Sequence, residues 1–400
     1  MGPILHSRPP TLPDYPQAGD IEVPDPGPGA VGGGLHRGVG DMPWTKAVRL
    51  ALVAACAGIL AAVVFTLVVH RTTPTATPVQ PRHTATPATP GIAIAQENFD
   101  LPDPFILTVK KTYYLYVSAA FGNTSQHIPM FSGSPGHWST RSTDAVPDLP
   151  PWAAPGLTWS PAVYKFGTLY VMYFSPAVAG TDPLQHCIAI ATSPSPKGPF
   201  YVRPTPFVCQ QNMGGDIDPQ LFVDPRGPNG PYQPNYLVWK GDNNSTTGDG
   251  ADTIWAQSLS NDGLFLEGQP VVLLHPTRPW EQPILEAPQM EMAPNSTVWV
   301  FFTAGTGFFS PNYAMGAVKC AGPLGPCKDV LKRPLIASNQ QGSGPGEETY
   351  FVGPDGSDWL LYSPVHTEYL PELFRPVMAS RIGWSKKGPY VAEAGSFPRP

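Results

Sequence analysis

Five short aromatic strands recur along the chain at a nearly constant interval, and this repeat limits the folds open to it. They begin about 60 residues apart, and turn-forming pairs such as Phe166-Gly167 precede several of them. After residue 93 the apolar runs are short and end at Gly, Pro, Asn or Asp, which is typical of strands and not of helices. The five strands are Tyr113–Ser118, Leu169–Ser175, Tyr236–Trp239, Val298–Thr303 and Trp359–Ser363.

A long fixed period with several strands in each unit is the signature of a β-propeller. A β-sandwich has shorter spacing between equivalent strands, and a sixth propeller blade would need a unit that the sequence does not contain. We therefore predict an all-β fold, a five-bladed β-propeller over residues 93–400. Roughly 300 residues are ample for a large buried core.

The first 92 residues have a different composition and predict three further segments. Residues 1–46 are rich in Pro and Gly and are expected to be a disordered cytoplasmic tail. Leu50–Val69 is an apolar stretch broken only by Thr66, which predicts a transmembrane signal-anchor helix over residues 47–70. Residues 71–92 are rich in Thr and Pro and predict an extended, disordered stalk that links the membrane to the propeller.

The charges beside the apolar stretch set its expected orientation. Lys46 and Arg49 lie on its N-terminal side, so the tail is expected inside the cell and the propeller outside. A cleaved signal peptide is the weaker alternative, because the preceding tail is long and no small-x-small cleavage site follows. A buried globular helix is the other alternative, although its low-complexity flanks offer nothing to pack against.

Cysteine usage agrees with an exported domain. Cys56 lies in the apolar stretch, whereas the other four cysteines lie in the expected propeller. An even number outside the membrane suggests disulfides, with three connectivities open. Local pairing of Cys187 with Cys209 and of Cys320 with Cys327 is the simplest, and free buried thiols are the alternative. The spacing does not match a zinc site.

The overall charge argues against a nucleic-acid partner. The formal net charge is -6 at pH 7, and no run of Lys and Arg interleaved with aromatic residues occurs. A nucleic-acid-binding protein would favour a basic face.

Three carboxylates stand one or two residues before a proline, ahead of the aromatic strands. They are Asp103, Asp218 and Glu286, and the segment Trp159-Ser160-Pro161 has the same shape without an acid. In a propeller, equivalent positions of successive blades converge on one axis, so these residues are expected at the channel mouth. Two carboxylates that face one sugar bond are the minimal equipment for glycoside hydrolysis. An Asp before Pro is also common as a turn or cap, and Trp159 alone fits a core position equally well.

These segments resemble those of glycoside hydrolase family 43 over roughly residues 97–370. The family consists of five-bladed propellers that remove arabinofuranosyl or xylosyl units, so the resemblance implies an α-L-arabinofuranosidase, β-xylosidase or arabinanase. The matching segments are Phe99–Leu107, Trp159–Val163, Gly215–Asp224 and Leu285–Gln289, with softer matches at Ala191–Phe200 and Gly344–Gly346.

The resemblance also implies a role for each matched residue. Asp103 matches the general base, Glu286 the general acid, and Asp218 the third carboxylate, which adjusts the pKa and orientation of the acid. Trp159 matches an aromatic residue that lines the pocket for the terminal sugar. An inverting mechanism needs the acid and base about 6.5–9.5 Å apart, with room for a water molecule.

The fifth unit departs from the family pattern. Glu347 follows Gly344-Pro345-Gly346, where members commonly have a His that in some of them helps to hold a channel ion. Ser363 likewise follows Tyr362 in place of a common His. We therefore expect no cofactor and regard an axial calcium as poorly supported by the sequence. The Asn-Asp-Pro-Asn and Arg-Asp-Pro segments of fructan-cleaving relatives are absent, which disfavours that branch.

Several other residues carry weaker expectations. Asp216 and Asp224 flank Asp218 and are expected at turns or on the surface. The segment 241–252 lacks the spacing and the terminal Glu of a calcium loop, so it is expected to be a hairpin loop. Three aromatic residues in a Gly-rich stretch either form a rim for a polysaccharide or pack the edge of a blade: Phe308, Phe309 and Tyr313.

The sequence thus predicts a single-pass membrane protein whose extracytoplasmic domain is an inverting glycosidase. The expected substrate is a polysaccharide with arabinofuranosyl or xylosyl linkages, such as cell-envelope arabinan. A catalytically inactive carbohydrate-binding propeller is the alternative, motivated by the altered fifth unit. An adhesion or signalling ectodomain is the third class. The sequence does not distinguish arabinose from xylose, or exo from endo action.

Overall fold

The computed structural model describes residues 91–95, 100–119, 125–181, 184–227, 234–243, 252–339, 342–365, 375–393 and 395–400. The chain divides into two units, residues 1–82 and 83–400, and all described residues belong to the second. The predicted tail, the transmembrane helix and almost all of the stalk lie outside the described residues. Within the described ranges, no helix is long and apolar enough to span a membrane.

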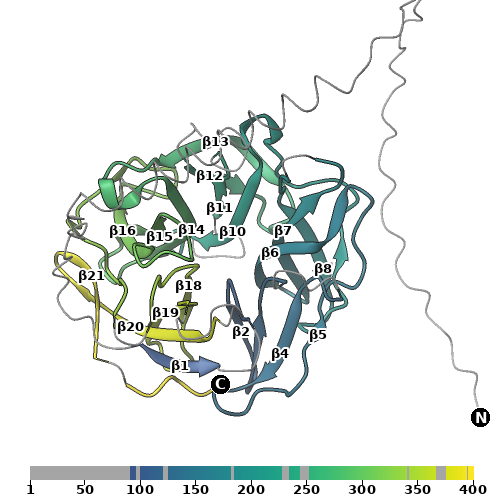
Figure 1. Cartoon of the computed structure of the whole chain (residues 1–400), viewed down its shortest axis with the longest axis horizontal. Helices are drawn as coiled ribbons and strands as arrows, with labels where there is room; N and C mark the ends of the chain where they lie inside the picture. Colours follow the sequence, from purple (N-terminus) through teal and green to yellow (C-terminus); the bar gives the residue numbers. More distant parts are fainter. Residues whose placement is uncertain are drawn as a thin grey trace, which may run out of the picture. The chain divides into compact units, whose positions relative to one another are not determined.

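Five antiparallel sheets surround a common centre (Figure 1). Each of the first four has four strands in chain order, and their innermost strands contact one another in succession. The first sheet contains β2 (Phe105–Val109), β3 (Thr112–Tyr116), β4 (Pro129–Gly133) and β5 (Thr143–Asp144). The second contains β6 (Ala153–Phe166), β7 (Leu169–Val178), β8 (Ala189–Ser193) and β9 (Tyr201–Val202).

The third and fourth sheets repeat this arrangement. The third contains β10 (Asp216–Val223), β11 (Asn235–Gly241), β12 (Thr253–Leu259) and β13 (Leu266–Leu274). The fourth contains β14 (Ile284–Met292), β15 (Val298–Gly305), β16 (Ala314–Cys320) and β17 (Cys327–Lys328). Two 3₁₀ helices precede the innermost strands, η1 (Gln211–Met213) and η2 (Pro279–Glu281).

The fifth sheet joins the two ends of the domain. It contains β18 (Thr349–Val352), β19 (Asp358–Tyr362), β20 (Val377–Ser385), β21 (Gly388–Val391) and the N-terminal β1 (Ile92–Ala95). β1 pairs with the first half of β20 and β21 with its second half. Strands from both ends of the domain therefore close the ring, as Figure 1 shows beside the C-terminus. The predicted five-bladed propeller is confirmed, and its first strand begins at Ile92, one residue before the expected boundary.

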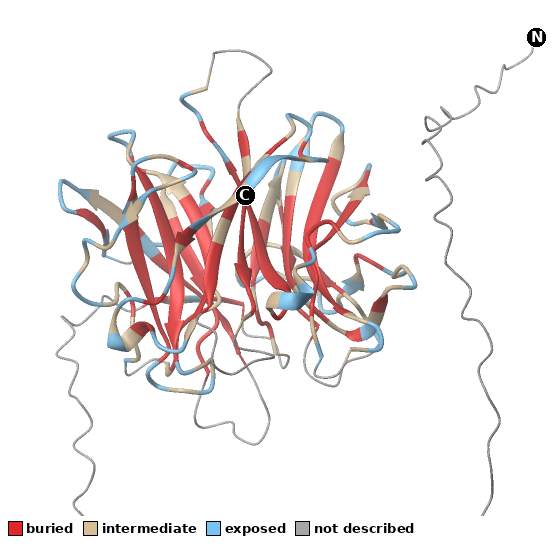
Figure 2. Cartoon of the chain, turned by 90° about the horizontal axis from the view of Figure 1, so that it is seen from above, coloured by how far each residue is buried: buried red, intermediate tan, exposed pale blue. Residues whose placement is uncertain are grey.

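The aromatic strands of the sequence repeat are the second strands of the blades, β3, β7, β11, β15 and β19. They read as continuous apolar runs because neighbouring blades cover both of their faces. On β7, Met172 packs toward the first blade, whereas Val171 and Tyr173 pack toward the third. Each of the five apolar clusters lies between two neighbouring blades. Figure 2 shows these buried residues along the middle of the strands, with exposed residues at the loops.

Both local disulfides are formed in the structure. Cys187 pairs with Cys209, which ties the segment before β8 to the loop before η1, and Cys320 pairs with Cys327 between β16 and β17. These are the pairs that local connectivity suggested.

Replacing each disulfide by two serines is expected to lower the free energy of unfolding. The sequence separations of 22 and 7 residues correspond to about 3 and about 2 kcal/mol in the loop-entropy model. Urea unfolding of the oxidised full-length chain and of the two double variants would measure this. If removing the Cys320–Cys327 disulfide lowered the free energy of unfolding more than removing Cys187–Cys209, the entropy of the unfolded chain would not explain which disulfide stabilises more.

Candidate active site

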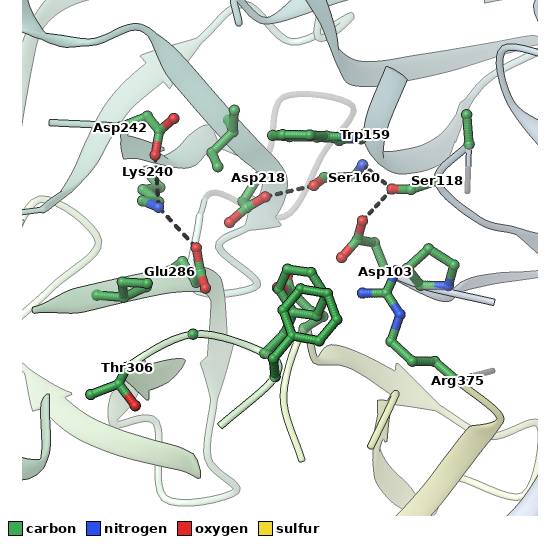
Figure 3. A pocket seen from close by; sticks show the side chains of 18 residues that line it. Asp103, Ser118, Trp159, Ser160, Asp218, Lys240, Asp242, Glu286, Thr306 and Arg375 are labelled. Atoms are coloured by element: carbon green, nitrogen blue, oxygen red, sulfur yellow. Dashed lines mark hydrogen bonds and ion pairs between the residues drawn. The ribbon is translucent and has the colours of Figure 1, made fainter. Parts of the chain in front are cut away.

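A pocket of about 310 Å³ opens where the five blades meet, and every blade contributes to its wall (Figure 3). Four of the predicted site residues line it together. The walls include Asp103, Ser118, Trp159, Asp218, Lys240, Glu286, Glu347 and Arg375. Asp103 and Glu286 lie on opposite sides of the pocket, and Asp218 lies between them (Figure 3).

One backbone feature repeats at the pocket in all five blades. Asp103, Ser160, Asp218, Ala287 and Glu347 all have left-handed φ angles, between 49° and 57°. Non-glycine residues rarely adopt this conformation, which costs about 1–3 kcal/mol and clusters at functional sites. In the second, third and fourth blades the left-handed residue forms a bulge in the innermost strand. The bulge marks the true repeat position of the site.

The left-handed position shows which residues of the five blades are equivalent, and Glu286 is not equivalent to the other two acids. Asp103, Asp218 and Glu347 occupy the left-handed position itself, whereas Glu286 stands one residue earlier. Its equivalent in the second blade is Trp159, not Ser160. Neighbouring residues of a bulge project in different directions. The offset therefore places the Glu286 carboxylate on another wall of the pocket from the carboxylates that stand at the repeat position.

Two serines hold the acids of the first and third blades in place. The Ser118 hydroxyl donates to Asp103 and accepts a hydrogen bond from the Ser160 backbone N–H at 2.7 Å. The Ser160 hydroxyl in turn donates to Asp218 Oδ1 at 2.5 Å. These contacts form a continuous chain from Asp103 to Asp218 across the second blade.

Asp218 is buried beside another carboxylate. Its Oδ2 accepts a hydrogen bond from the Ala287 backbone N–H at 2.9 Å, so it contacts the segment that carries Glu286. Burial, followed by the charge of Glu286, raises the pKa of Asp218 to about 7. The burial and the neighbouring carboxylate therefore both favour the protonated form of Asp218.

A buried lysine, which the sequence analysis did not single out, stands behind Glu286. Lys240 Nζ lies 2.8 Å from Glu286 Oε2, 2.8 Å from Asp242 Oδ1 and 3.4 Å from Asp252 Oδ2. Burial opposes its charge, but the three carboxylates and Asp218 hold its pKa well above the usual value. Asp242 and Asp252 come from the two ends of segment 241–252. That segment connects the antiparallel strands β11 and β12, as expected for a hairpin, and residues 244–251 lie outside the described part.

Trp159 lines the pocket and is supported from behind by a histidine. Its indole stacks on the His186 ring with 3.8 Å between centroids and 20° between planes. Burial lowers the pKa of His186 to about 4, so the ring is neutral at pH 7. The pair presents a flat, uncharged surface to the pocket.

Glu347, the residue expected to weaken the site, lies inside it. Its carboxylate Oε1 accepts a hydrogen bond from the Tyr313 hydroxyl at 2.7 Å, and its side chain also hydrogen-bonds Asp103. Burial, followed by the charge of Asp103, raises the pKa of Glu347 well above its usual value. The next residue, Glu348, accepts a hydrogen bond from Thr303.

These residues do not fit a channel ion. The Glu347 oxygens are engaged by Tyr313 and Asp103, and a carboxyl with a raised pKa is a poor cation ligand at neutral pH. Among the residues that the structure describes, no group of three or more His, Cys, Asp and Glu side chains is arranged to hold a metal.

The aromatic residues of the fourth blade take two different places. Phe308 and Phe309 line the pocket, with their ring centroids 3.8 Å apart. The Arg375 guanidinium lies 4.7 Å from the centre of the Phe308 ring and forms paired hydrogen bonds to Asp100 at 2.8 and 2.7 Å. Tyr313, in contrast, is fully buried beneath the site. The rim alternative therefore applies to the two phenylalanines only.

One of the weaker expectations was wrong. Asp216 is neither at a turn nor on the surface, because it begins β10 and has an exposed fraction of 0%. It accepts hydrogen bonds from Trp239 Nε1 at 2.9 Å and from the Gln210 backbone at 2.5 Å, and burial raises its pKa to about 7. Asp224 lies next to a turn as expected, where Arg226 pairs with it at 2.7 Å, although only 7% of it is exposed. Trp239 comes from the next strand, so the residues that flank Asp216 could not reveal this partner.

The arrangement suits acid–base chemistry on an uncharged substrate. When two carboxyl groups face each other across a pocket, the ionised one can activate a water molecule and the protonated one can give its proton to an oxygen of the substrate. The pocket walls hold several acids and a stacked aromatic pair, so they favour a neutral ligand with a flat face over an anion.

Comparison with known proteins agrees with this chemistry. The model of the family described as glycosyl hydrolases family 43 matches residues 97–390. A thermostable family-43 glycoside hydrolase is similar in structure, with a TM-score of 0.63, 23% identity, and coverage of 77% of this chain and 98% of that one. An endo-1,4-beta-xylanase from Bacteroides thetaiotaomicron has a TM-score of 0.60 at 20% identity, with coverage of 78% and 99%. An alpha-L-arabinofuranosidase from Lactobacillus brevis has a TM-score of 0.60 at 19% identity, with coverage of 75% and 96%. Among curated protein sequences, none matches the chain significantly.

Proposed function

Because the chain belongs to glycosyl hydrolases family 43, we propose that it is an inverting glycoside hydrolase that cleaves arabinofuranosyl or xylosyl linkages in a polysaccharide. One observation carries this proposal: Asp103 and Glu286 face each other across one pocket with Asp218 between them. Residues 183 positions apart in the sequence line the same pocket, which supports their assignment as base and acid.

In the proposed reaction, Asp103 acts as the base. Ser118 donates to one of its oxygens and orients it, so that it can take a proton from water as the water attacks the anomeric carbon. Glu286, protonated, donates to the leaving glycosidic oxygen as that bond breaks. Attack from the face opposite the leaving group inverts the anomeric configuration.

Asp218 and Trp159 support these two groups. Asp218 acts on Glu286 through its charge and through the backbone of Ala287, so we assign it a positioning role. Trp159 offers an apolar face against which a sugar ring can stack. Its stacked partner His186 fixes the plane of the indole.

The proposed substrate class rests on the pocket and on the relatives. The acidic walls disfavour uronic acids and other anionic sugars, whereas neutral pentoses are compatible with them. The structural neighbours include a xylanase and an arabinofuranosidase, and their names motivate the two pentoses.

We further propose that the propeller is displayed outside the cell on a single membrane helix. The apolar stretch 50–69 and the Thr/Pro-rich segment that follows it support this placement. The two disulfides support it as well, because such bonds persist in oxidising compartments. Cell-envelope arabinan would then lie within reach of the domain.

The proposal is tested with the full-length chain, in detergent, on aryl arabinofuranosides, aryl xylosides, arabinan and xylan. We expect turnover of at least one of these, and proton NMR of the first product formed should show the inverted anomer. A retained anomer would refute the inverting mechanism. Glycan binding without any turnover would instead support the alternative of an inactive carbohydrate-binding propeller.

A further inference from the structure

The Tyr313 hydroxyl lies between two carboxyl groups of the site. It is 2.5 Å from Glu286 Oε1 and 2.7 Å from Glu347 Oε1, and Tyr313 is fully buried. Burial, followed by the charges of the two glutamates, raises the pKa of Tyr313 well above its usual value, so the phenol stays neutral. A neutral phenol has one proton to donate. Both contacts are therefore hydrogen bonds only if one of the two glutamates is protonated and donates to the phenol oxygen.

The contact between Glu347 and Asp103 adds a second condition. Two carboxyl groups form a hydrogen bond only when one of them carries a proton. Two sets of protons in which every bond runs in the same direction satisfy all three contacts, and they are the reverse of each other. In the first, Glu286 donates to Tyr313, Tyr313 donates to Glu347, and Glu347 donates to Asp103. In this set Glu286 is protonated and Asp103 is ionised, as the proposed reaction requires at its start. Lys240 donates to the other oxygen of Glu286 and does not interrupt the chain.

We propose that Tyr313 and Glu347 form a proton-return path from Asp103 to Glu286, which rests on the proposed hydrolase function. Each turnover leaves Asp103 protonated by the attacking water and Glu286 ionised by donation to the leaving group. The site must move one proton from base to acid before it can react again. Both residues act through Asp103 and Glu286, so they are positioning residues.

The return needs one reorientation and three proton shifts. After the sugar bond is cleaved, the Glu347 carboxyl turns so that its protonated oxygen faces Tyr313, and the Tyr313 hydroxyl turns so that its proton faces Glu286 Oε1. Asp103 then gives its proton to the unprotonated Glu347 oxygen, Glu347 gives its own proton to the phenol oxygen, and Tyr313 gives its proton to Glu286 Oε1. No net charge is left on Tyr313 or Glu347, and the starting set is restored. Without this path the proton must leave Asp103 for solvent and another must reach Glu286.

The sharpest test is the Glu347→Gln variant of the full-length chain. Glutamine has the same shape, can donate through its amide to Asp103 and can accept from Tyr313, but it cannot pass a proton on. With enzyme in excess over an aryl arabinofuranoside or xyloside, the single-turnover rate should fall by less than about threefold. The steady-state kcat should fall by about tenfold or more, because the acid and base are reset slowly. Formate or imidazole at rising concentration should restore kcat by carrying the proton.

Tyr313→Phe removes the middle of the path. It should likewise lower kcat much more than the single-turnover rate, and formate or imidazole should restore kcat. Tyr362→Phe is the matched control, because it also removes a buried hydroxyl, whose hydrogen-bond partner in the described part of the chain is Ser380 at 3.1 Å. Its kcat should match that of the unaltered protein and should not respond to formate. Equal losses of single-turnover rate and kcat, unchanged rates, or losses without rescue in Glu347→Gln would overturn the proton path. If the unaltered protein releases no sugar even in a single turnover, the proposed function itself fails.

Discussion

The Glu286→Ala variant is expected to lose about 10³-fold in kcat on arabinan or xylan oligosaccharides, but far less on nitrophenyl glycosides. A sugar alkoxide leaves only when an acid protonates it, whereas a nitrophenolate leaves without that help. Steady-state kinetics of the full-length chain on both substrate types would measure the ratio. Equal losses on the two substrates would contradict the role of Glu286 as the acid.

Asp103→Asn provides the contrast within the same experiment. Attack by water needs the base whatever the leaving group is, so this variant should lose about 10³-fold on both substrate types. Asp148→Asn is the control, because Asp148 is exposed and lies outside the pocket. Its kinetics should equal those of the unaltered protein. If Asp103→Asn instead lost far more activity on the oligosaccharides than on the nitrophenyl glycosides, Asp103 would be the acid and Glu286 the base.

Replacing Lys240 by Met is expected to destabilise the fold by about 3–5 kcal/mol at pH 7. Lys240 is 2% exposed and is the shared partner of Glu286, Asp242 and Asp252. Its removal leaves three carboxylates together in a buried site without a counter-charge, and breaking a buried ion pair costs about this much. Urea unfolding of the full-length chain at pH 7 and at pH 4 would measure the loss. It should shrink at pH 4, because burial raises the pKa of Asp252 to about 6 and this acid is then protonated.

Lys319→Met is the matched control for that experiment, because Lys319 is an exposed lysine on β16. Its effect should be within about 0.5 kcal/mol at both pH values. A Lys240→Met loss that is small, or that is the same at pH 7 and pH 4, would show that Lys240 does not hold the three acids together.

Much of the fold could be predicted because its signal is local. The second strand of each blade is covered on both faces, so apolar and aromatic residues occupy nearly every position, as on β7 and β15. Turn residues bound these runs at similar intervals, and five such units lead to one architecture. Asp103, Asp218 and Glu286 were found for the same reason, because each stands one or two residues before a proline, ahead of a run of this kind.

The partners of those acids were not predicted, because they come from distant parts of the chain. Asp242 and Asp252, which pair with Lys240, flank the polar stretch 243–251, and nothing local distinguishes them from surface acids. Tyr313 stands in a Gly- and Ser-rich stretch that also fits a loop at the rim. A charged residue inside an apolar run was the one usable signal for Lys240, which follows Leu237, Val238 and Trp239.

By itself, the sequence determined the number of blades, the residues that fill the space between them, and the three acids beside the axis. Only the tertiary structure decided how those acids work together. The left-handed bulge shifts Glu286 by one residue relative to Asp103 and Asp218 and turns it onto another wall. Tyr313 and Glu347, from the fourth and fifth blades, then join acid to base. Such contacts depend on the direction of each side chain after the ring has closed, and no local pattern encodes that direction.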